Sequence, residues 1–193
     1  MSKPKSLEDL LQTTNPVDLL RNQQTGPNVY PGVPPEYTNW RDEQEAWQKT
    51  CVLFNQSYHM VDLAVEGPDA LKLLSHLGVN TFKNFEVDRA KQFVCCTPDG
   101  YVIGDVILFY LDKEKFNLVG RAPLINWVEY HAATGGYNVT VERDERTAVR
   151  KDPSRRKSYR FQIQGPNAKH VVEKATGKPA PDLKFFHMTT IEI

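Results

Sequence analysis

The feature of this sequence that most restricts its fold is a short pattern that occurs twice. Residues 63–70 read LAVEGPDA, and residues 161–168 read FQIQGPNA. In each copy the residues before the glycine indicate a strand, and the glycine permits a sharp exit from it. The proline then fixes the φ angle with which a helix begins. Because the copies lie too far apart for a solenoid repeat, two pseudo-symmetric halves are predicted.

The remaining pattern predicts an α+β fold. Alternating apolar residues between turn signals indicate strands, and apolar residues behind a cap or a proline indicate helices. The expected strands cover residues 59–66, 91–97, 101–111, 116–120, 137–142 and 161–164, and the expected helices cover 40–49, 69–77, 123–134 and 169–175.

Composition divides the chain into four stretches. Residues 1–37, rich in Pro and Gly turn signals, predict an N-terminal arm that is extended apart from a short helix around 6–12. Residues 38–145 form the first lobe, and 146–160 form a basic loop. Residues 161–193 begin the second half, and a strand-like alternation over the last eleven of them (183–193) stops in mid-pattern. We therefore expect the second half to continue beyond residue 193.

The basic stretch leaves two interpretations open. Residues 143–160 carry eight Lys or Arg against three Asp or Glu and show no periodicity. Such a loop could bind a phosphate or a polyglutamate tail, or it could be a solvated surface loop.

Bulk properties exclude several classes of protein. The formal net charge is zero, which argues against a nucleic-acid or anionic-membrane surface. The N-terminal residues lack the apolar core of a signal peptide, and no apolar run approaches the roughly 18 residues of a membrane span. Cys51, Cys95 and Cys96 fit neither a disulfide framework nor a zinc site. We expect a cytoplasmic protein with thiols buried as small apolar groups, no metal, and no P-loop or dinucleotide fingerprint.

Longer motifs resemble known families. The two Gly-Pro-x-Ala units, the segment GYVIGD at 100–105 and Trp127 resemble the folate-binding fold of the glycine-cleavage T-protein. More particular segments resemble the tetrahydrofolate-dependent O-demethylases of lignin-derived aromatic acids such as syringate, vanillate and 3-O-methylgallate: YP at 30–31, NWR at 39–41, LFNQSYHMVDL at 53–63, GRAP at 120–123, YHAATGGYNV at 130–139 and RFQIQGP at 160–166.

The resemblance implies both a fold and a reaction. It implies antiparallel sheets with flanking helices, in the front part of a three-lobed molecule. The implied reaction moves the methyl group of a methoxylated aromatic acid to N5 of tetrahydrofolate. Because a phenolate must leave, the site needs an acid or a cation that stabilises the developing charge. A substrate carboxylate further calls for a fixed cation, ideally arginine.

Three residues are candidates for the substrate site. His59 shares strand parity with inward-facing residues, so it could donate a hydrogen bond to the substrate phenol or leaving oxygen; otherwise it is a core histidine bonded to backbone. Arg121 precedes a helix N-terminus and could bind the substrate carboxylate, or form a surface salt bridge. Tyr30 could act in catalysis from an arm that closes over the pocket, or pin the arm to the surface. The resemblance places a further catalytic tyrosine beyond residue 193.

Four residues are candidates for holding tetrahydrofolate. An amide at Gln164 suits the edge of a pterin, and Val119 and Gly120 could line its pocket. T-proteins carry paired aspartates where this chain has Gly104 and Asp105. The glycine argues against aminomethyl transfer, and it leaves Asp105 as either a folate contact or a turn residue. The alternatives are an enzyme of the same fold that moves an aminomethyl or S-methyl group, and a folate-binding regulatory protein without catalysis.

Overall fold

The structure, a computed structural model, describes residues 7–21, 37–145 and 156–193. The helices are α1 (Leu7–Thr13), α2 (Pro16–Arg21), α3 (Trp40–Lys49), α4 (Ala70–Leu77), α5 (Ala122–Thr134) and α6 (Ala168–Thr176). The strands are β1 (Val52–Asn55), β2 (Val61–Glu66), β3 (Arg89–Cys96), β4 (Val102–Asp112), β5 (Lys115–Gly120), β6 (Thr140–Asp144) and β7 (Phe161–Gln164).

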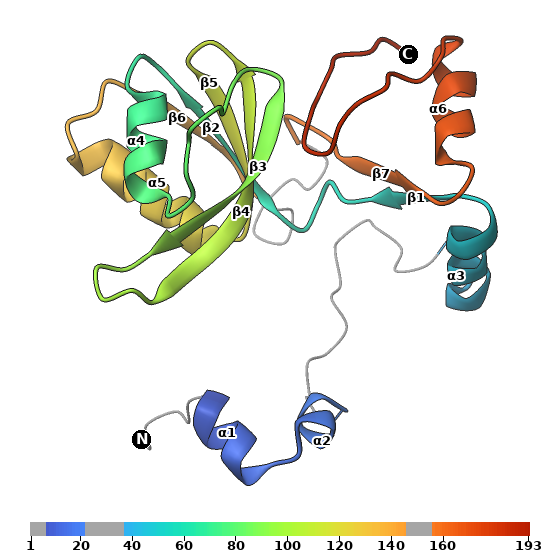
Figure 1. Ribbon diagram of the computed structural model, residues 1–193, viewed down its shortest axis with the longest axis horizontal. Coiled ribbons are helices and arrows are strands. Elements are labelled where there is room, and N and C mark those ends of the chain that lie inside the picture. The colour runs from blue at the N-terminus through green and yellow to red at the C-terminus, as the bar shows by residue number, and fades with distance from the viewer. Residues whose placement is uncertain (1–6, 22–36, 146–155) are drawn as a thin grey trace.

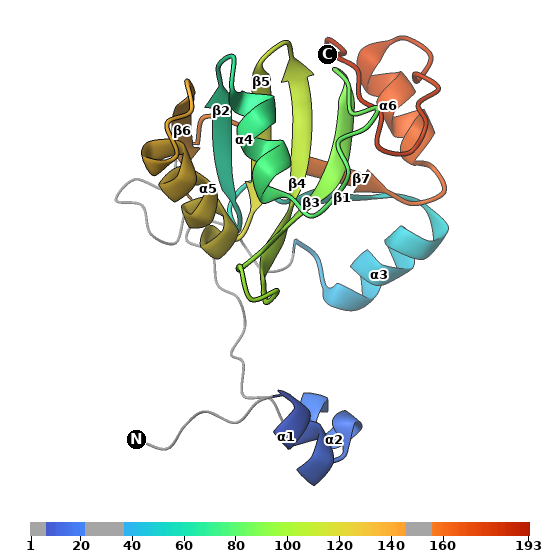
Figure 2. The ribbon, with the colours of Figure 1, turned by 60° about the vertical axis from the view of Figure 1, so that its left-hand side comes forward.

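Two antiparallel sheets organise these elements. The larger has the strand order β3-β4-β5-β2-β6, and the smaller pairs β1 with β7. Helices α4 and α5 lie against one face of the larger sheet, and the β1–β7 pair lies away from them (Figures 1 and 2). This arrangement confirms the predicted α+β class with antiparallel sheets and flanking helices.

One apolar core joins the larger sheet to its two helices. Val61, Leu63 and Val65 alternate along β2 and are fully buried, as the period of two predicts. They pack with alternate residues of β3, β4 and β5 and with the inward sides of α4 and α5. The intervening residues, among them Asp62 and Val119, therefore lie on the opposite face of the sheet.

The two Gly-Pro units have the same geometry, which confirms the predicted duplication. Gly67 and Gly165 have φ angles of 133° and 136°, which residues with a side chain rarely adopt. A Cβ atom would lie 2.5 Å from the carbonyl oxygen of Asn138 in the first unit and 2.5 Å from that of Thr50 in the second. Both positions therefore require glycine.

The strands that pair with the two Gly-Pro units also occupy equivalent positions. Glu66 at the end of β2 pairs with Thr140 of β6. The matching Gln164 of β7 pairs with Val52 of β1. Strand β1 thus takes beside β7 the place that β6 takes beside β2. The second half is therefore built from segments on both sides of the first in sequence.

The strand predicted from residue 59 begins two residues later. His59 lies in a bend, and β2 starts at Val61, whose partner is Gly120. The preceding residues are instead tied to the segment before β7, because the Gln56 amide donates to the Arg160 carbonyl at 2.9 Å. The predicted parity of His59 with the inward-facing residues of β2 is therefore wrong.

The strand predicted at the C-terminal end is absent from the described residues. Residues 183–193 form only an isolated bridge between Arg89 and His187. Phe186 has a φ angle of 58°, and the His187 amide closes a turn onto Lys184 at 3.0 Å. A turn at this point interrupts the extended geometry that the alternation predicted.

The N-terminal arm contains a second helix, α2, in a segment that the sequence predicted to be extended. The Asn15-Pro16 pair starts α2 rather than a turn, since the Asn15 side chain accepts from the Val17 amide at 2.9 Å. Proline suits the first position of a helix because it lacks the donor that would remain unpaired there. The short helix predicted around residues 6–12 corresponds to α1.

Candidate functional site

A cavity of about 450 Å³ opens where β4 and β5 meet the start of α5. This volume lies within the range of small-molecule sites. The lining is mainly apolar and comprises Gln56, Met60, Ile103, Gly104, Asp105, Val106, Ile107, Phe109, Val119, Gly120, Arg121, Pro123, Leu124 and Arg160. Four of the residues predicted from the sequence are among them: Arg121, Val119, Gly120 and Asp105.

Arg121 is available to a ligand. It is the N-cap residue of α5, its backbone is extended, and its side chain makes no capping hydrogen bond. It is exposed and forms no ion pair with any residue in the ranges that the structure describes. A guanidinium beside a helix N-terminus favours an anion, because the charge and the helix dipole act in the same direction.

The wall beneath Arg121 is shaped by a glycine. A Cβ atom on Gly120 would lie 2.2 Å from Cγ1 of Val106. No larger residue fits there without moving β4. Asp105 is exposed at the rim, where its Oδ2 accepts a hydrogen bond from Nε2 of Gln92 at 2.9 Å.

His59 lies half-buried among positive charges. Burial lowers its pKa, and the charge of Arg160 lowers it further. Arg121 and Arg156 act in the same direction, whereas a hydrogen bond with the backbone of Gln56 opposes them. Since the ordinary pKa of histidine is about 6.5, His59 is neutral at pH 7. It can therefore donate one N–H hydrogen bond without carrying charge.

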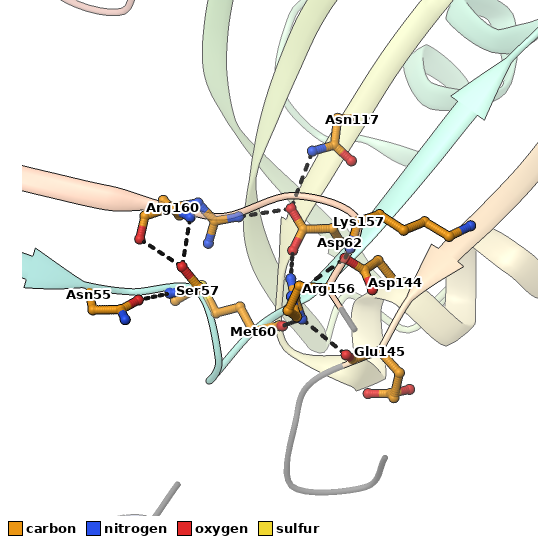
Figure 3. Close-up of polar contacts among 10 residues, drawn as sticks. All are labelled: Asn55, Ser57, Met60, Asp62, Asn117, Asp144, Glu145, Arg156, Lys157 and Arg160. Atoms are coloured by element: carbon orange, nitrogen blue, oxygen red, sulfur yellow. Dashed lines mark hydrogen bonds and ion pairs between the residues drawn. The ribbon is translucent and has the colours of Figure 1, made fainter. Parts of the chain in front are cut away.

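A network of acids and arginines connects β2 and β6 with the segment before β7 (Figure 3). The guanidinium of Arg156, whose side chain is 1% exposed, is paired with Asp62 of β2 and lies 3.4 Å from Asp144 of β6. A second arginine, Arg160, reaches the other oxygen of Asp62 at 2.8 Å. Asn117 donates to that oxygen at 3.4 Å. The two acids and two arginines balance one another in charge.

Backbone contacts complete the network. Arg156 donates to the carbonyl oxygens of Met60 at 3.1 Å and Glu145 at 3.0 Å. The amide of Lys157 donates to Asp144 at 2.9 Å. Burial of several charges is tolerable only with such pairing. For Arg156 and Arg160 the expectation of a solvated loop is therefore wrong, and residues 146–155 lie outside the described residues.

Three predicted site residues are not placed in the cavity lining. His59 lies in the bend between Gln56 and Met60, which both line the cavity, but it is not itself part of the lining. Gln164 ends β7, away from the cavity lining, and its side chain accepts a hydrogen bond from Gln162. Tyr30 lies outside the described residues.

The sequence interpretation missed Arg160 and Asp62, although a signal existed. If the repeat is extended by one residue toward the N-terminus, Asp62 precedes the first copy and Arg160 precedes the second. These equivalent positions carry opposite charges, and the structure joins them directly. The pair thus links the two halves beside the cavity.

The cysteines are free thiols in this structure. Cys95 is buried in the core, and burial raises the pKa of its thiol to about 12. Cys51 and Cys96 are half-buried. Among the described helices, none has the length and apolar character needed to cross a membrane.

Comparisons with known proteins place these features in a family. The profile of the GCVT N-terminal domain matches residues 20–193. A syringate O-demethylase from Sphingobium sp. is 66% identical over 98% of the chain and 41% of its own length. An aminomethyltransferase from Halothermothrix orenii is 29% identical over 82% of the chain and 42% of its own length. The chain thus spans about two-fifths of these relatives.

A solved structure has the same fold. The glycine cleavage system aminomethyltransferase T of Bartonella henselae matches with a TM-score of 0.58 and 24% identity, over 76% of this chain and 37% of that one. Together with the duplicated units, the family match leads to one conclusion: this chain belongs to the family of GCVT N-terminal domains.

Proposed function

We propose that this chain is part of a cytoplasmic, tetrahydrofolate-dependent O-demethylase in the catabolism of lignin-derived aromatic acids. Its substrate is syringate or a close relative. The observation that carries the proposal is the 66% identity with a syringate O-demethylase over 98% of the chain. Arg121 supports it, because it lies on a largely apolar cavity without an ion pair to any described residue, and an aromatic carboxylate has the matching chemistry.

Arg121 binds the substrate carboxylate in this proposal. It sits at the helix N-terminus and has no competing acid among the described residues, so an incoming carboxylate gains a charge-assisted, bidentate contact. The apolar side chains of Ile107, Phe109 and Leu124 then enclose the aromatic ring. Tyr30 is proposed to contact the substrate from the N-terminal arm.

His59 acts on the oxygen that leaves. The bond between the methyl carbon and the ether oxygen breaks with its electron pair on oxygen, and a proton completes the phenol. A neutral His59 donates its N–H toward that oxygen and raises no second positive charge among the arginines. When bound, tetrahydrofolate supplies N5, which accepts the methyl group and gives up its proton.

The chemical character of the residues at the cavity suits a pterin. Val119 and Gly120 line the cavity, and a side chain at Gly120 would collide with Val106. Asp105 stands at the rim as a hydrogen-bond acceptor. We assign these residues to binding tetrahydrofolate, together with the amide of Gln164, which lies at the end of β7 outside the cavity lining.

The test follows the product directly. The full-length protein is incubated with tetrahydrofolate and a panel of methoxybenzoates, and 5-methyltetrahydrofolate is measured. Turnover of syringate or a related methoxybenzoate is expected. The proposal fails if no aromatic ether is demethylated while an aminomethyl or S-methyl donor is consumed, or if no donor is consumed at all.

A further inference from the structure

Arg160 has a place in the structure that the proposed function does not use. It lines the cavity, yet one amino group lies 2.8 Å from Oδ1 of the buried Asp62. Its side chain is 26% exposed. Within the described parts of the chain no acceptor engages its other side-chain N–H groups. One N–H group of Arg160 is thus engaged by Asp62, and the remaining N–H groups can donate to a ligand.

The backbone of Arg160 is fixed as firmly as its side chain. Its amide donates to Oγ of Ser57 at 2.9 Å, and that hydroxyl donates back to the Arg160 carbonyl at 3.1 Å. The same carbonyl accepts from the amide of Gln56 at 2.9 Å. The segment before β7 is therefore locked onto the bend that carries His59.

Asp62 in turn cannot move. It is 4% exposed, and it is held by Arg156 and Asn117 as well as by Arg160. A carboxylate with this many donors keeps the guanidinium of Arg160 in one orientation. Electrostatic stabilisation is most effective when donors are fixed before the reaction, since no reorganisation is then needed as charge develops.

The two arginines of the cavity have different surroundings. Arg121 is exposed at the helix N-terminus, where it suits a carboxylate that is charged throughout the reaction. Arg160 is partly buried, and its charge has the largest effect of any charged group on His59. A charge acts more strongly where water is excluded. Arg160 therefore suits charge that develops only in the transition state, beside the residue that contacts the leaving oxygen.

We propose that Arg160 is a catalytic residue that stabilises the developing phenolate, and that Asp62 is the residue that positions it. This inference rests on the proposed function. As the methyl–oxygen bond breaks, the electron pair stays on the phenolate oxygen, and Arg160 donates hydrogen bonds to it. Burial lowers the pKa of Arg160 and the charge of Asp62 opposes that shift, and the guanidinium keeps its proton throughout the reaction. The one proton that the product phenol gains is balanced by the one that N5 of tetrahydrofolate would release on accepting the methyl group.

The test compares Arg160→Gln with Arg121→Gln in the full-length protein. The substrates are methoxybenzoates whose leaving phenols differ in pKa, together with a methoxyphenol that lacks the carboxylate. For Arg160→Gln, kcat is expected to fall by about 10²–10³-fold, most for the phenols of highest pKa, so that the plot of log kcat against leaving-group pKa steepens. Arg121→Gln is expected to raise KM for carboxylated substrates only, with an unchanged slope.

Two further variants, each first shown by circular dichroism to be folded, test the positioning of Arg160 and its forked donors. Asp62→Asn is expected to steepen the plot in the same direction but less than Arg160→Gln. Arg160→Lys keeps the charge and loses the forked donors, so its slope is expected to fall between those of the wild type and Arg160→Gln. If Arg160→Gln does not fold, Arg160→Lys decides: a wild-type kcat and slope overturn the inference.

The role of Arg160 can be refuted while the proposed function still holds. An equal loss of kcat for every substrate in Arg160→Gln, or a change in KM alone, overturns it while wild-type turnover of methoxybenzoates stands. Absence of methyl transfer by the wild type instead refutes the proposed function on which the inference rests.

Discussion

Replacing Gly67 with alanine tests the close approach on which each Gly-Pro unit depends. A backbone held at φ 133° is strained for any residue with a Cβ, at a cost of about 1–3 kcal/mol. The new Cβ would also lie 2.5 Å from the Asn138 carbonyl oxygen and 3.0 Å from Cα of Val139. Crowding against backbone adds about 1–3 kcal/mol. The sum predicts a loss of about 4 kcal/mol.

A matched control separates backbone strain from crowding. Gly177 also has a positive φ angle, 66°, but no atom lies within 4 Å of its Cβ position. Gly177→Ala is therefore expected to cost only about 1–2 kcal/mol. Gly165→Ala, at φ 136° and 2.5 Å from the Thr50 carbonyl oxygen, should resemble Gly67→Ala.

The assay is native-state hydrogen exchange of the amides around each position, because it reports the opening free energy of each Gly-Pro unit separately. The opening free energy is compared with that of the wild type for each variant. If Gly67→Ala costs no more than Gly177→Ala, the strand exit does not approach the 138–139 backbone as described, and the steric reasoning is refuted.

Three further predictions concern titratable groups. Asp62→Asn leaves Arg156 without its main partner and should destabilise the protein by about 3–5 kcal/mol in chemical denaturation; a loss below about 1 kcal/mol would contradict burial of the pair. Because the pKa of His59 is lowered on folding, the unfolded chain binds its proton first, so stability should fall as pH drops below about 6.5. His59→Asn should reduce that dependence, measured as Tm against pH. An unchanged dependence would refute the assignment of this pH effect to His59. Cys95, with a pKa of about 12, should resist iodoacetamide at pH 8 in the native protein, as mass spectrometry of its peptide will reveal.

Local signals predicted much of the first half. The helix at 40–49 follows from the Asn39 cap, whose side chain accepts from the amides of Arg41 and Asp42. The first strand of the repeat follows from the buried alternation of Val61, Leu63 and Val65. These signals depend on neighbours in sequence, and such patterns are readable without knowledge of the tertiary fold.

Long-range pairing was not readable in the same way. Nothing local in Val52–Asn55 specifies that this strand pairs with β7 rather than with a neighbour. The alternation at 183–193 predicted a strand, but an extended segment forms one only if a partner edge meets it, and here the chain turns at Phe186.

The residues of the site also differ in whether local sequence signals could identify them. Arg121, Val119, Gly120 and Asp105 reach one cavity because a strand end and a helix start are local features. Arg160 was missed because its role depends on Asp62, a residue distant in sequence that the pseudo-symmetry brings beside it. The basic character of the 146–160 stretch concealed a buried ion pair, since charge counts carry no information on burial.

Methyl transfer is tested most directly by following an isotopic label in the methoxy carbon. The full-length protein is mixed with tetrahydrofolate and syringate labelled with ¹³C in its methoxy groups, and the labelled products are followed by NMR. The label is expected on the N5 methyl of tetrahydrofolate, with the demethylated phenol formed in equal amount. Label that stays on the aromatic ring, or that emerges as formaldehyde or methanol, would contradict methyl transfer to folate.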